Sequence, residues 1–97
     1  MKAWCVIGAR VLTNRCGQLA QMLPSGTVLL AGSYCGWGGE TPSATAEEFN
    51  PTSSSWFPVA SMTNARGLTT SVRLADGSVL ALGGYNPDSA VERFRPS

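Results

Sequence analysis

An internal repeat constrains this chain more than any other feature of its sequence. The segment LPSGTVLLAGSY at 23–34 aligns without a gap with LADGSVLALGGY at 74–85, 51 residues further on. Beyond it, residues 47–51 align with residues 92–96, 45 positions on, through a glutamate, a phenylalanine and a proline. The difference between the two offsets falls within CGWGGETPS at 35–43, so the first copy has the longer loop. The chain is therefore expected to fold as two similar units.

Each copy predicts an antiparallel meander of short strands. The predicted strands are 18–23, 28–31, 45–49 and 56–60 in the first copy, and 69–74, 79–82 and 90–94 in the second. Ser25-Gly26 and Asp76-Gly77 predict tight turns after the first strands. The second strands are continuous apolar runs, so both of their faces should be covered, whereas the third strands alternate and should be half exposed. The glycine that follows each second strand permits a sharp turn or a close backbone approach.

Composition agrees with an all-β chain. Eleven glycines and a charged fraction of only 13% favour strands and turns, and they exclude a coiled coil. Helical periodicity is absent from the sequence. The fold class is therefore expected to be all-β and antiparallel.

The order of residues after each second strand identifies a family pattern. A glycine-closed strand is followed by Glu-x-Phe-x-Pro, then by Trp56, and then by Met-x-x-x-Arg ending at Arg66. This order resembles the kelch repeat of β-propeller proteins, in the bacterial and fungal form found in the propeller of galactose-oxidase-type proteins. The first copy departs from the pattern at Ser33, where the second copy has its second glycine. The resemblance covers essentially the whole chain and implies two kelch-type blades, each a four-stranded antiparallel meander.

The resemblance also divides the chain. One blade is expected at about 15–65 and a second at about 66–97, within a single propeller segment spanning 1–97. The second blade lacks a fourth strand, which residues 2–8 are expected to supply. If the two ends were joined, Trp4 would follow Pro96 by five residues, the spacing that also separates Trp56 from Pro51.

Two blades are too few to close a ring, which usually takes about four to eight. Two explanations therefore stay open. Either the chain is part of a longer propeller, or roughly three or four copies form a ring of about six or eight blades. In the second case, residues 2–7 of one copy would complete the second blade of the next. The chain is accordingly expected to be a homo-oligomer or part of a longer propeller.

The loops of a meander predict a candidate binding surface. The connections between second and third strands share one end of the sheet with the connections leading from a fourth strand to the next first strand. The candidate binding residues expected at this end are Arg15, Tyr34, Trp37, Arg66 and Tyr85. Aromatic and arginine side chains on clustered loops suit recognition of a protein partner or a small ligand, which is how kelch propellers often bind.

Structural interpretations of the same residues stay open. One such interpretation pairs Arg15 and Arg66 with Glu47 and Glu92 between strands. Another packs Trp37 within its own loop, since Trp37 lies in the segment that the second copy lacks. The two remaining tryptophans, Trp4 and Trp56, are predicted to pack within the blades.

Charge and residue types exclude several classes of function. A formal net charge of +1 gives no case for nucleic acid or an anionic membrane as partner. The sequence contains no histidine, so the usual general base and zinc ligand are absent, and no cofactor or metal is expected. Cys5, Cys16 and Cys35 form no CxxC pair and are interpreted as unpaired thiols, with a single disulfide left open. The apolar run at 4–9 is too short to span a bilayer, and nothing indicates a cellular compartment.

An enzymatic alternative follows from the same resemblance. Copper-radical oxidases carry a similar propeller, in which a cysteine near the start of a first strand is cross-linked to a tyrosine of a third strand. Cys16 lies close to the first of these places, but Phe49 and Phe94 occupy the second, and neither can form a tyrosyl radical. The chain is therefore expected to be a non-catalytic module for binding or scaffolding. The alternative is a fragment of a larger secreted galactose-oxidase-like or carbohydrate-active kelch protein.

Overall fold

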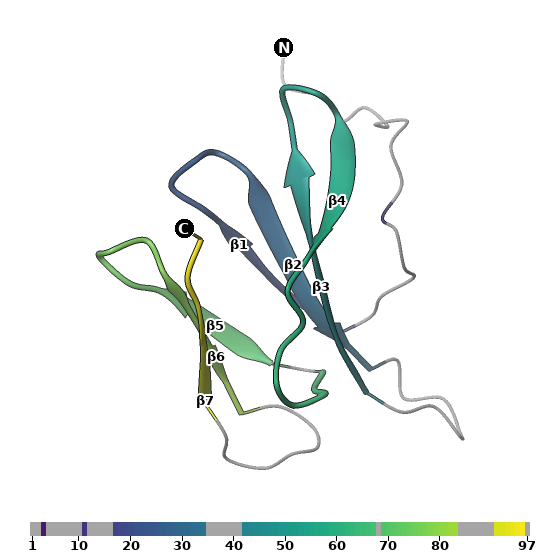
Figure 1. Cartoon of the computed structure of the whole chain (residues 1–97), viewed down its shortest axis with the longest axis vertical. Coiled ribbons are helices and arrows are strands. Elements are labelled where there is room, and N and C mark those ends of the chain that lie inside the picture. The colour runs from purple at the N-terminus through teal and green to yellow at the C-terminus, as the bar shows by residue number, and fades with distance from the viewer. Residues whose placement is uncertain are drawn as a thin grey trace.

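The structure, a computed structural model, describes residues 3, 11, 17–34, 42–67, 69–83 and 91–96, and within these ranges it contains strands and no helix (Figure 1). The strands are β1 (Leu19–Met22), β2 (Val28–Ser33), β3 (Ser43–Asn50), β4 (Ser55–Val59), β5 (Thr70–Arg73), β6 (Val79–Leu82) and β7 (Val91–Phe94). The predicted all-β class and the predicted strand positions are confirmed. The fourth strand expected at 2–7 lies outside the described residues, apart from Ala3, which is exposed and in no strand.

The strands form two antiparallel meanders in chain order. The four-stranded sheet has the order β1-β2-β3-β4, and the three-stranded sheet has the order β5-β6-β7. Corresponding strands pair in corresponding register, since Ala20 lies opposite Leu30 in the first sheet and Ser71 lies opposite Ala81 in the second. The sequence repeat is therefore a structural repeat.

Glycine closes the first turn of each sheet as the turn dipeptides predict. Gly26 and Gly77 have φ angles of +91° and +90°, a region that glycine enters without a steric penalty. In the second turn, the carboxylate of Asp76 accepts hydrogen bonds from the hydroxyl of Ser78 at 2.6 Å and from its N–H at 3.0 Å. These two hydrogen bonds lower the pKa of Asp76. Local residue chemistry thus fixes both hairpins.

The two sheets pack face to face, with their first strands β1 and β5 side by side (Figure 1). Leu29 and Ala31 of β2 contribute to the core from one sheet, and Val79 and Ala81 of β6 contribute from the other. The buried apolar residues of the core are Leu19, Leu23, Leu29, Ala31, Ala46, Val79 and Ala81. Each of these sheets therefore uses one face to cover the other.

A glycine at the end of β2 brings the chain after β4 close to the four-stranded sheet. Gly32 has a φ of +77°, and a Cβ there would clash with the carbonyl oxygen of Arg66. The same oxygen accepts a hydrogen bond from the N–H of Ser33 at 3.1 Å. The predicted close approach after the second strand is confirmed at this position.

Burial departs from the prediction in β3, whereas β7 alternates between exposed and half-buried residues as predicted. The second strand β2 is buried on both faces, as expected, but β6 is buried only on the face of Val79 and Ala81, so the expectation is wrong for β6. The expected half exposure of β3 is wrong, because Ala46, Glu47 and Glu48 are all buried. The two glutamates lie on opposite faces, as strand geometry requires, and Glu48 accepts a hydrogen bond from the hydroxyl of Thr27 at 2.9 Å. The three-stranded sheet covers the face that carries Glu48, a contact that alternation within one strand does not reveal.

Candidate functional site

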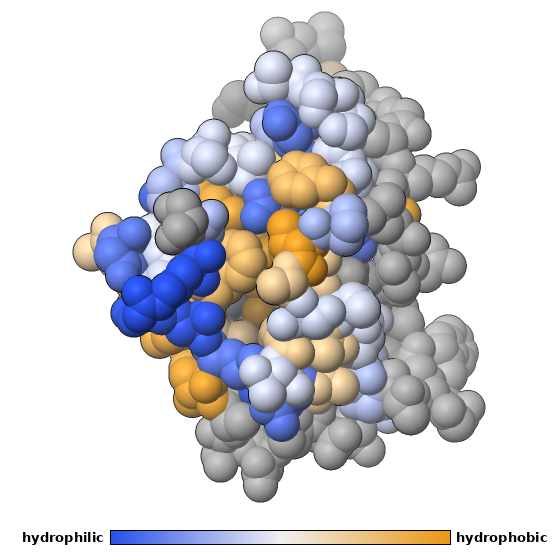
Figure 2. All heavy atoms as spheres, in the orientation of Figure 1, coloured by the Kyte–Doolittle hydropathy of each residue, from blue (hydrophilic) through white to orange (hydrophobic). Residues whose placement is uncertain are grey.

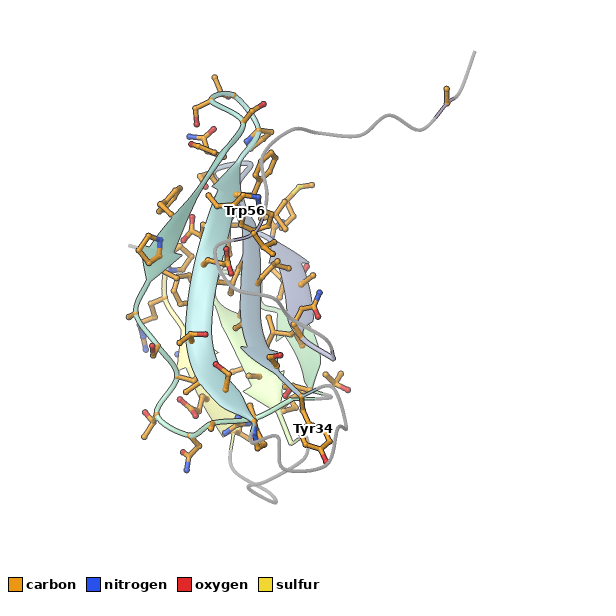
Figure 3. The ribbon with its side chains drawn as sticks, turned by 90° about the vertical axis from the view of Figure 1, so that its right-hand side faces the viewer. Tyr34 and Trp56 are labelled. Carbon is orange, nitrogen blue, oxygen red and sulfur yellow. The ribbon has the colours of Figure 1, made fainter. Side chains whose placement is uncertain are left out.

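The predicted loop end is formed, in its described part, by the connection after β4 and by the ends of β2 and β3. The N–H of Met62 donates to the carbonyl of Ala44 at 2.8 Å, and the N–H of Arg66 donates to the carbonyl of Ser43 at 3.1 Å. Tyr34 follows β2 and is half-buried, and Gly67 lies so close that a Cβ there would clash with it. Figure 3 shows Tyr34 at this end of the sheet. The prediction that these connections share one end is confirmed for the described residues.

Arg66 lies within the molecule and ties the connection to the three-stranded sheet. Its side chain is 0% exposed. The guanidinium donates to the carbonyls of Ala81 at 3.3 Å and Gly83 at 3.2 Å, and to a carboxylate oxygen of Glu92 at 3.1 Å. The ion-pair interpretation of Arg66 is therefore confirmed. Its guanidinium holds the fold together at the place where the loop end meets the second sheet.

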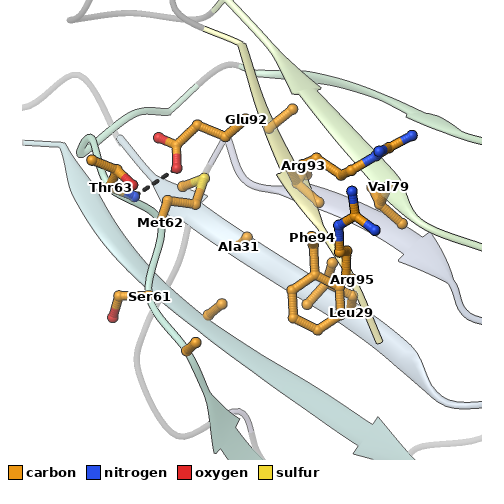
Figure 4. Close-up of a pocket in the computed structure, with 14 residues that line it drawn as sticks. Leu29, Ala31, Ser61, Met62, Thr63, Val79, Glu92, Arg93, Phe94 and Arg95 are labelled. Carbon is orange, nitrogen blue, oxygen red and sulfur yellow. Dashed lines mark hydrogen bonds between the residues drawn. The ribbon is translucent and has the colours of Figure 1, made fainter. Parts of the chain in front are cut away.

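Glu92 collects two more donors from the same connection. Its two carboxylate oxygens accept hydrogen bonds from the N–H of Thr63 at 2.6 Å (Figure 4) and from the N–H of Asn64 at 2.8 Å. Burial by itself raises the pKa of Glu92, but these hydrogen bonds and the charge of Arg66 outweigh burial and hold the pKa below its ordinary value of 4.5. Glu92 is thus an anion at neutral pH, and its three hydrogen-bond donors all belong to the connection between β4 and β5.

A cavity of about 260 Å³ lies between the two sheets beside Glu92 (Figure 4). Figure 2 shows apolar side chains gathered in the hollow between the sheets. The apolar residues that line the cavity include Leu29, Ala31, Ala46, Met62, Val79 and Phe94. Phe94 packs against the core, and Glu92, Arg93 and Arg95 also line the space (Figure 4). At about 260 Å³ the cavity is close to the lower end of the roughly 300–1,000 Å³ of small-molecule sites, so one inserted side chain or one small ligand would fill it.

The outer side of the three-stranded sheet leaves an apolar face exposed. Val72 and Val91 are 43% and 56% exposed, and Leu80 and Leu82 between them are half-buried. The repeat aligns Leu80, Leu82 and Val91 with Leu29, Ala31 and Ala46, all of which are buried in the core. Apolar positions that are buried in the first copy are therefore partly or fully exposed to solvent in the second. Among the described residues, β7 also pairs with β6 alone, which leaves its other edge unpaired.

Trp56 lies away from the loop end. On β4 it lies opposite Phe49, with ring centroids 5.0 Å apart and ring planes inclined by 45°. Figure 3 shows Trp56 and Tyr34 at opposite ends of the four-stranded sheet. The prediction that Trp56 packs within its own sheet is confirmed, and it belongs to the outer edge of that sheet.

The remaining sequence candidates lie outside the described residues: Arg15, Trp37 and Tyr85 of the binding set, together with Trp4, Cys5, Cys16 and Cys35. Of the predicted binding residues, the described part therefore brings together Tyr34 and the backbone of Arg66. In the same part of the chain, no cluster of His, Cys, Asp or Glu is suited to a metal ion. No described helix is long and apolar enough to cross a membrane.

Sequence reasoning missed the cavity and the exposed sheet face. A signal for the cavity was present in the alanines at positions 31, 46 and 81, small residues that leave space where two sheets meet. The chain matches no protein-family model and no curated protein. The geometry above therefore carries the functional argument.

Proposed function

We propose that this chain is a non-catalytic kelch-type β-propeller module that binds or scaffolds a protein or small-ligand partner, with several copies assembling a complete propeller. One observation carries the proposal: two repeat-related antiparallel sheets pack face to face with β1 beside β5. Blades stacked in a propeller have this relation, with their first strands gathered around a common axis. The two sheets lie within the segments assigned to the two blades, about 15–65 and about 66–97.

The exposed face of the three-stranded sheet supports assembly. Val91 exposes apolar surface at the position where the first copy buries Ala46, and Val72 adds exposed apolar surface on the same face. Contiguous apolar surface of this kind marks interaction sites, and an unpaired strand edge such as that of β7 invites a further strand. A further blade packed on this face would cover both features.

The loop end is the proposed partner surface. Tyr34 is the described aromatic residue there, and Arg15, Trp37 and Tyr85 are proposed to join it. Arg66 supports this surface from within through its ion pair with Glu92. In an assembled ring each copy presents the same loop end, so a partner meets a repeated surface and gains avidity from several contacts.

No specific observation favours the alternative of an oxidase fragment. Phe49 contacts Trp56 within its own sheet, with the ring planes tilted by 45°, and offers no phenol for radical chemistry. Phe94 lines the cavity between the sheets. We therefore carry forward the non-catalytic module alone.

The native mass of the purified chain, measured by light scattering after size exclusion, tests assembly directly. The expected result is a discrete oligomer, for example a trimer or a tetramer. Val72→Asp places a charge on the exposed face and should yield a folded monomer, whereas Thr52→Asp, in an exposed turn, should leave the oligomer unchanged. A wild-type chain that is folded and monomeric at micromolar concentration would overturn the proposed assembly.

A further inference from the structure

We propose that the open edge of β7 and the adjoining cavity receive residues 2–7 of a second copy of this chain, with the side chain of Trp4 filling the cavity beside Phe94. The inference rests on the proposed function and names the contact that joins the copies. Three observations support this contact: the register of the repeat, the size and apolar lining of the cavity, and the path of the chain between the two sheets.

The repeat fixes the register of the missing strand. In the first sheet, Phe49 of β3 lies directly opposite Trp56 of β4. Phe94 of β7 is the repeat equivalent of Phe49, and the Lys-Ala-Trp-Cys-Val-Ile segment at 2–7 places Trp4 where β4 has Trp56. A strand added to β7 in the same register therefore sets Trp4 opposite Phe94. Residues directly opposite each other in an antiparallel pair share one face of the sheet.

The shared face is the one that lines the cavity. Phe94 lies opposite Val79 in the sheet, and both line the cavity between the sheets. A cavity of about 150 Å³ with apolar walls already admits a benzene ring, so about 260 Å³ gives room for an indole. Aromatic rings favour contacts at centroid distances of about 4.5–7 Å, and the first sheet shows such a contact at 5.0 Å. Trp4 would repeat this contact on Phe94.

The path of the chain assigns the strand to a second copy. Residues 60–69 lead from β4, at the outer edge of one sheet, to β5, the first strand of the next sheet. Residues 8–18 are a link of similar length that leads into β1. If this link follows the same path, residues 2–7 would belong to a sheet that precedes β1 and lies on the side of Leu30. The three-stranded sheet of the same copy packs on the opposite side, against Leu29.

The exposed apolar face supplies an independent argument for the same arrangement. When a second copy inserts residues 2–7 beside β7, its own four-stranded sheet follows directly and comes to lie over Val72 and Val91. These two side chains are 43% and 56% exposed in the single copy. One docking event therefore pairs the open edge, fills the cavity and covers the apolar face.

A disulfide trap tests the register and the identity of the donor chain. The proposed register sets Cys5 opposite Arg93, and opposite residues in an antiparallel pair lie within about 4.5–5.5 Å between Cα atoms, a separation that a disulfide spans. The test protein is the full chain carrying Arg93→Cys, with Cys16→Ser and Cys35→Ser to remove the other thiols. After mild oxidation, the expected product is a reducible ladder of covalently linked chains, with the 5–93 link identified by mass spectrometry. Arg95→Cys in the same background is the matched control, because its diagonal separation of about 7–8 Å exceeds disulfide reach.

The outcomes separate this inference from the proposed function. A 5–93 link within one chain overturns the second-copy assignment, and an oligomer without any 5–93 link overturns the edge pairing while leaving assembly intact. A folded monomer that forms no link overturns both. Trp4→Ala adds a second readout: assembly should weaken roughly thirty-fold or more, as expected for an aromatic side chain that anchors an interface. An unchanged oligomer dissociation constant for Trp4→Ala would place the side chain outside the cavity.

Discussion

Replacing Arg66 by methionine should cost more stability than almost any other single change in the described structure. The substitution keeps an apolar stem but removes the donors to Ala81, Gly83 and Glu92. Removing one member of a buried ion pair leaves the other uncompensated and costs about 3–5 kcal/mol. A domain of this size has a total stability of about 5–15 kcal/mol, so the loss amounts to about a third of it or more.

Urea unfolding followed by circular dichroism measures this loss. With a urea dependence of about 1–3 kcal/mol per molar, the midpoint of the Arg66→Met variant should fall by about 2 M. Arg93→Met is the matched control, because Arg93 also pairs with a carboxylate, that of Asp76, but at 3.8 Å and with both side chains exposed. Exposed pairs contribute about 0–1 kcal/mol, so the control should unfold almost as the wild type does.

The double variant Arg66→Met/Glu92→Gln isolates the ion pair from the other contacts of each residue. If the pair is the main source of the effect, the loss in the double variant should fall short of the sum of the single losses by about 0.5–3 kcal/mol. A single Arg66→Met loss below about 1 kcal/mol, or losses that add, would refute the assignment of this buried pair as a main support of the loop end.

Three further outcomes follow from the described contacts. The pKa of Glu92 is lower in the folded chain than its ordinary value, so the ionised carboxylate stabilises the fold at pH values above that ordinary pKa. This stabilisation disappears as the pH falls through the lowered pKa. Between about pH 5 and pH 3, the thermal unfolding temperature should therefore decline less for Glu92→Gln than for the wild type. Gly32→Ala should cost at least about 2 kcal/mol in urea unfolding, because it adds a clash to a positive φ, whereas Gly26→Ala meets no neighbour and should cost about 1 kcal/mol. Trp56→Ala should destabilise the chain by at least about 1 kcal/mol, the value of its stacking on Phe49; equal stability of the variant would contradict that contact.

Strand positions could be predicted from the sequence because their signals are local. The turn dipeptides Ser25-Gly26 and Asp76-Gly77 fix the first hairpin of each sheet, and both glycines adopt the left-handed φ that these turns need. The repeat then transfers each assignment from one copy to the other. Gly32 was likewise predictable in kind, since a glycine after a buried strand indicates either a turn or a close approach.

Burial and the site could be predicted only in part, because they depend on how the two sheets meet. Glu47 and Glu48 follow an alternating pattern, yet both are buried. For Arg66 the sequence left two interpretations open, an exposed contact or an ion pair. The path of residues 60–67 decides between them by carrying the side chain to Glu92. The cavity arises where two sheets face each other across alanines, a relation that no single strand encodes.

The contact between the two sheets explains why the repeat does not close on itself as a two-sheet sandwich. In the contact between the sheets, the four-stranded sheet contributes Leu29 and Ala31, and the three-stranded sheet contributes Val79 and Ala81. In the repeat, these last two align with Val28 and Leu30, which belong to the opposite face of β2. The contact therefore joins two different faces of the repeat.

A contact between unlike faces can be repeated by further copies, and repetition either closes a ring or continues as an open filament, depending on the rotation at each step. The stacking of β1 beside β5 brings the first strands together on one side of the molecule, as a ring around an axis requires. A mass that stays constant as the protein concentration rises is therefore the expected light-scattering result. A mass that grows steadily with concentration would mean that the rotation between sheets does not close.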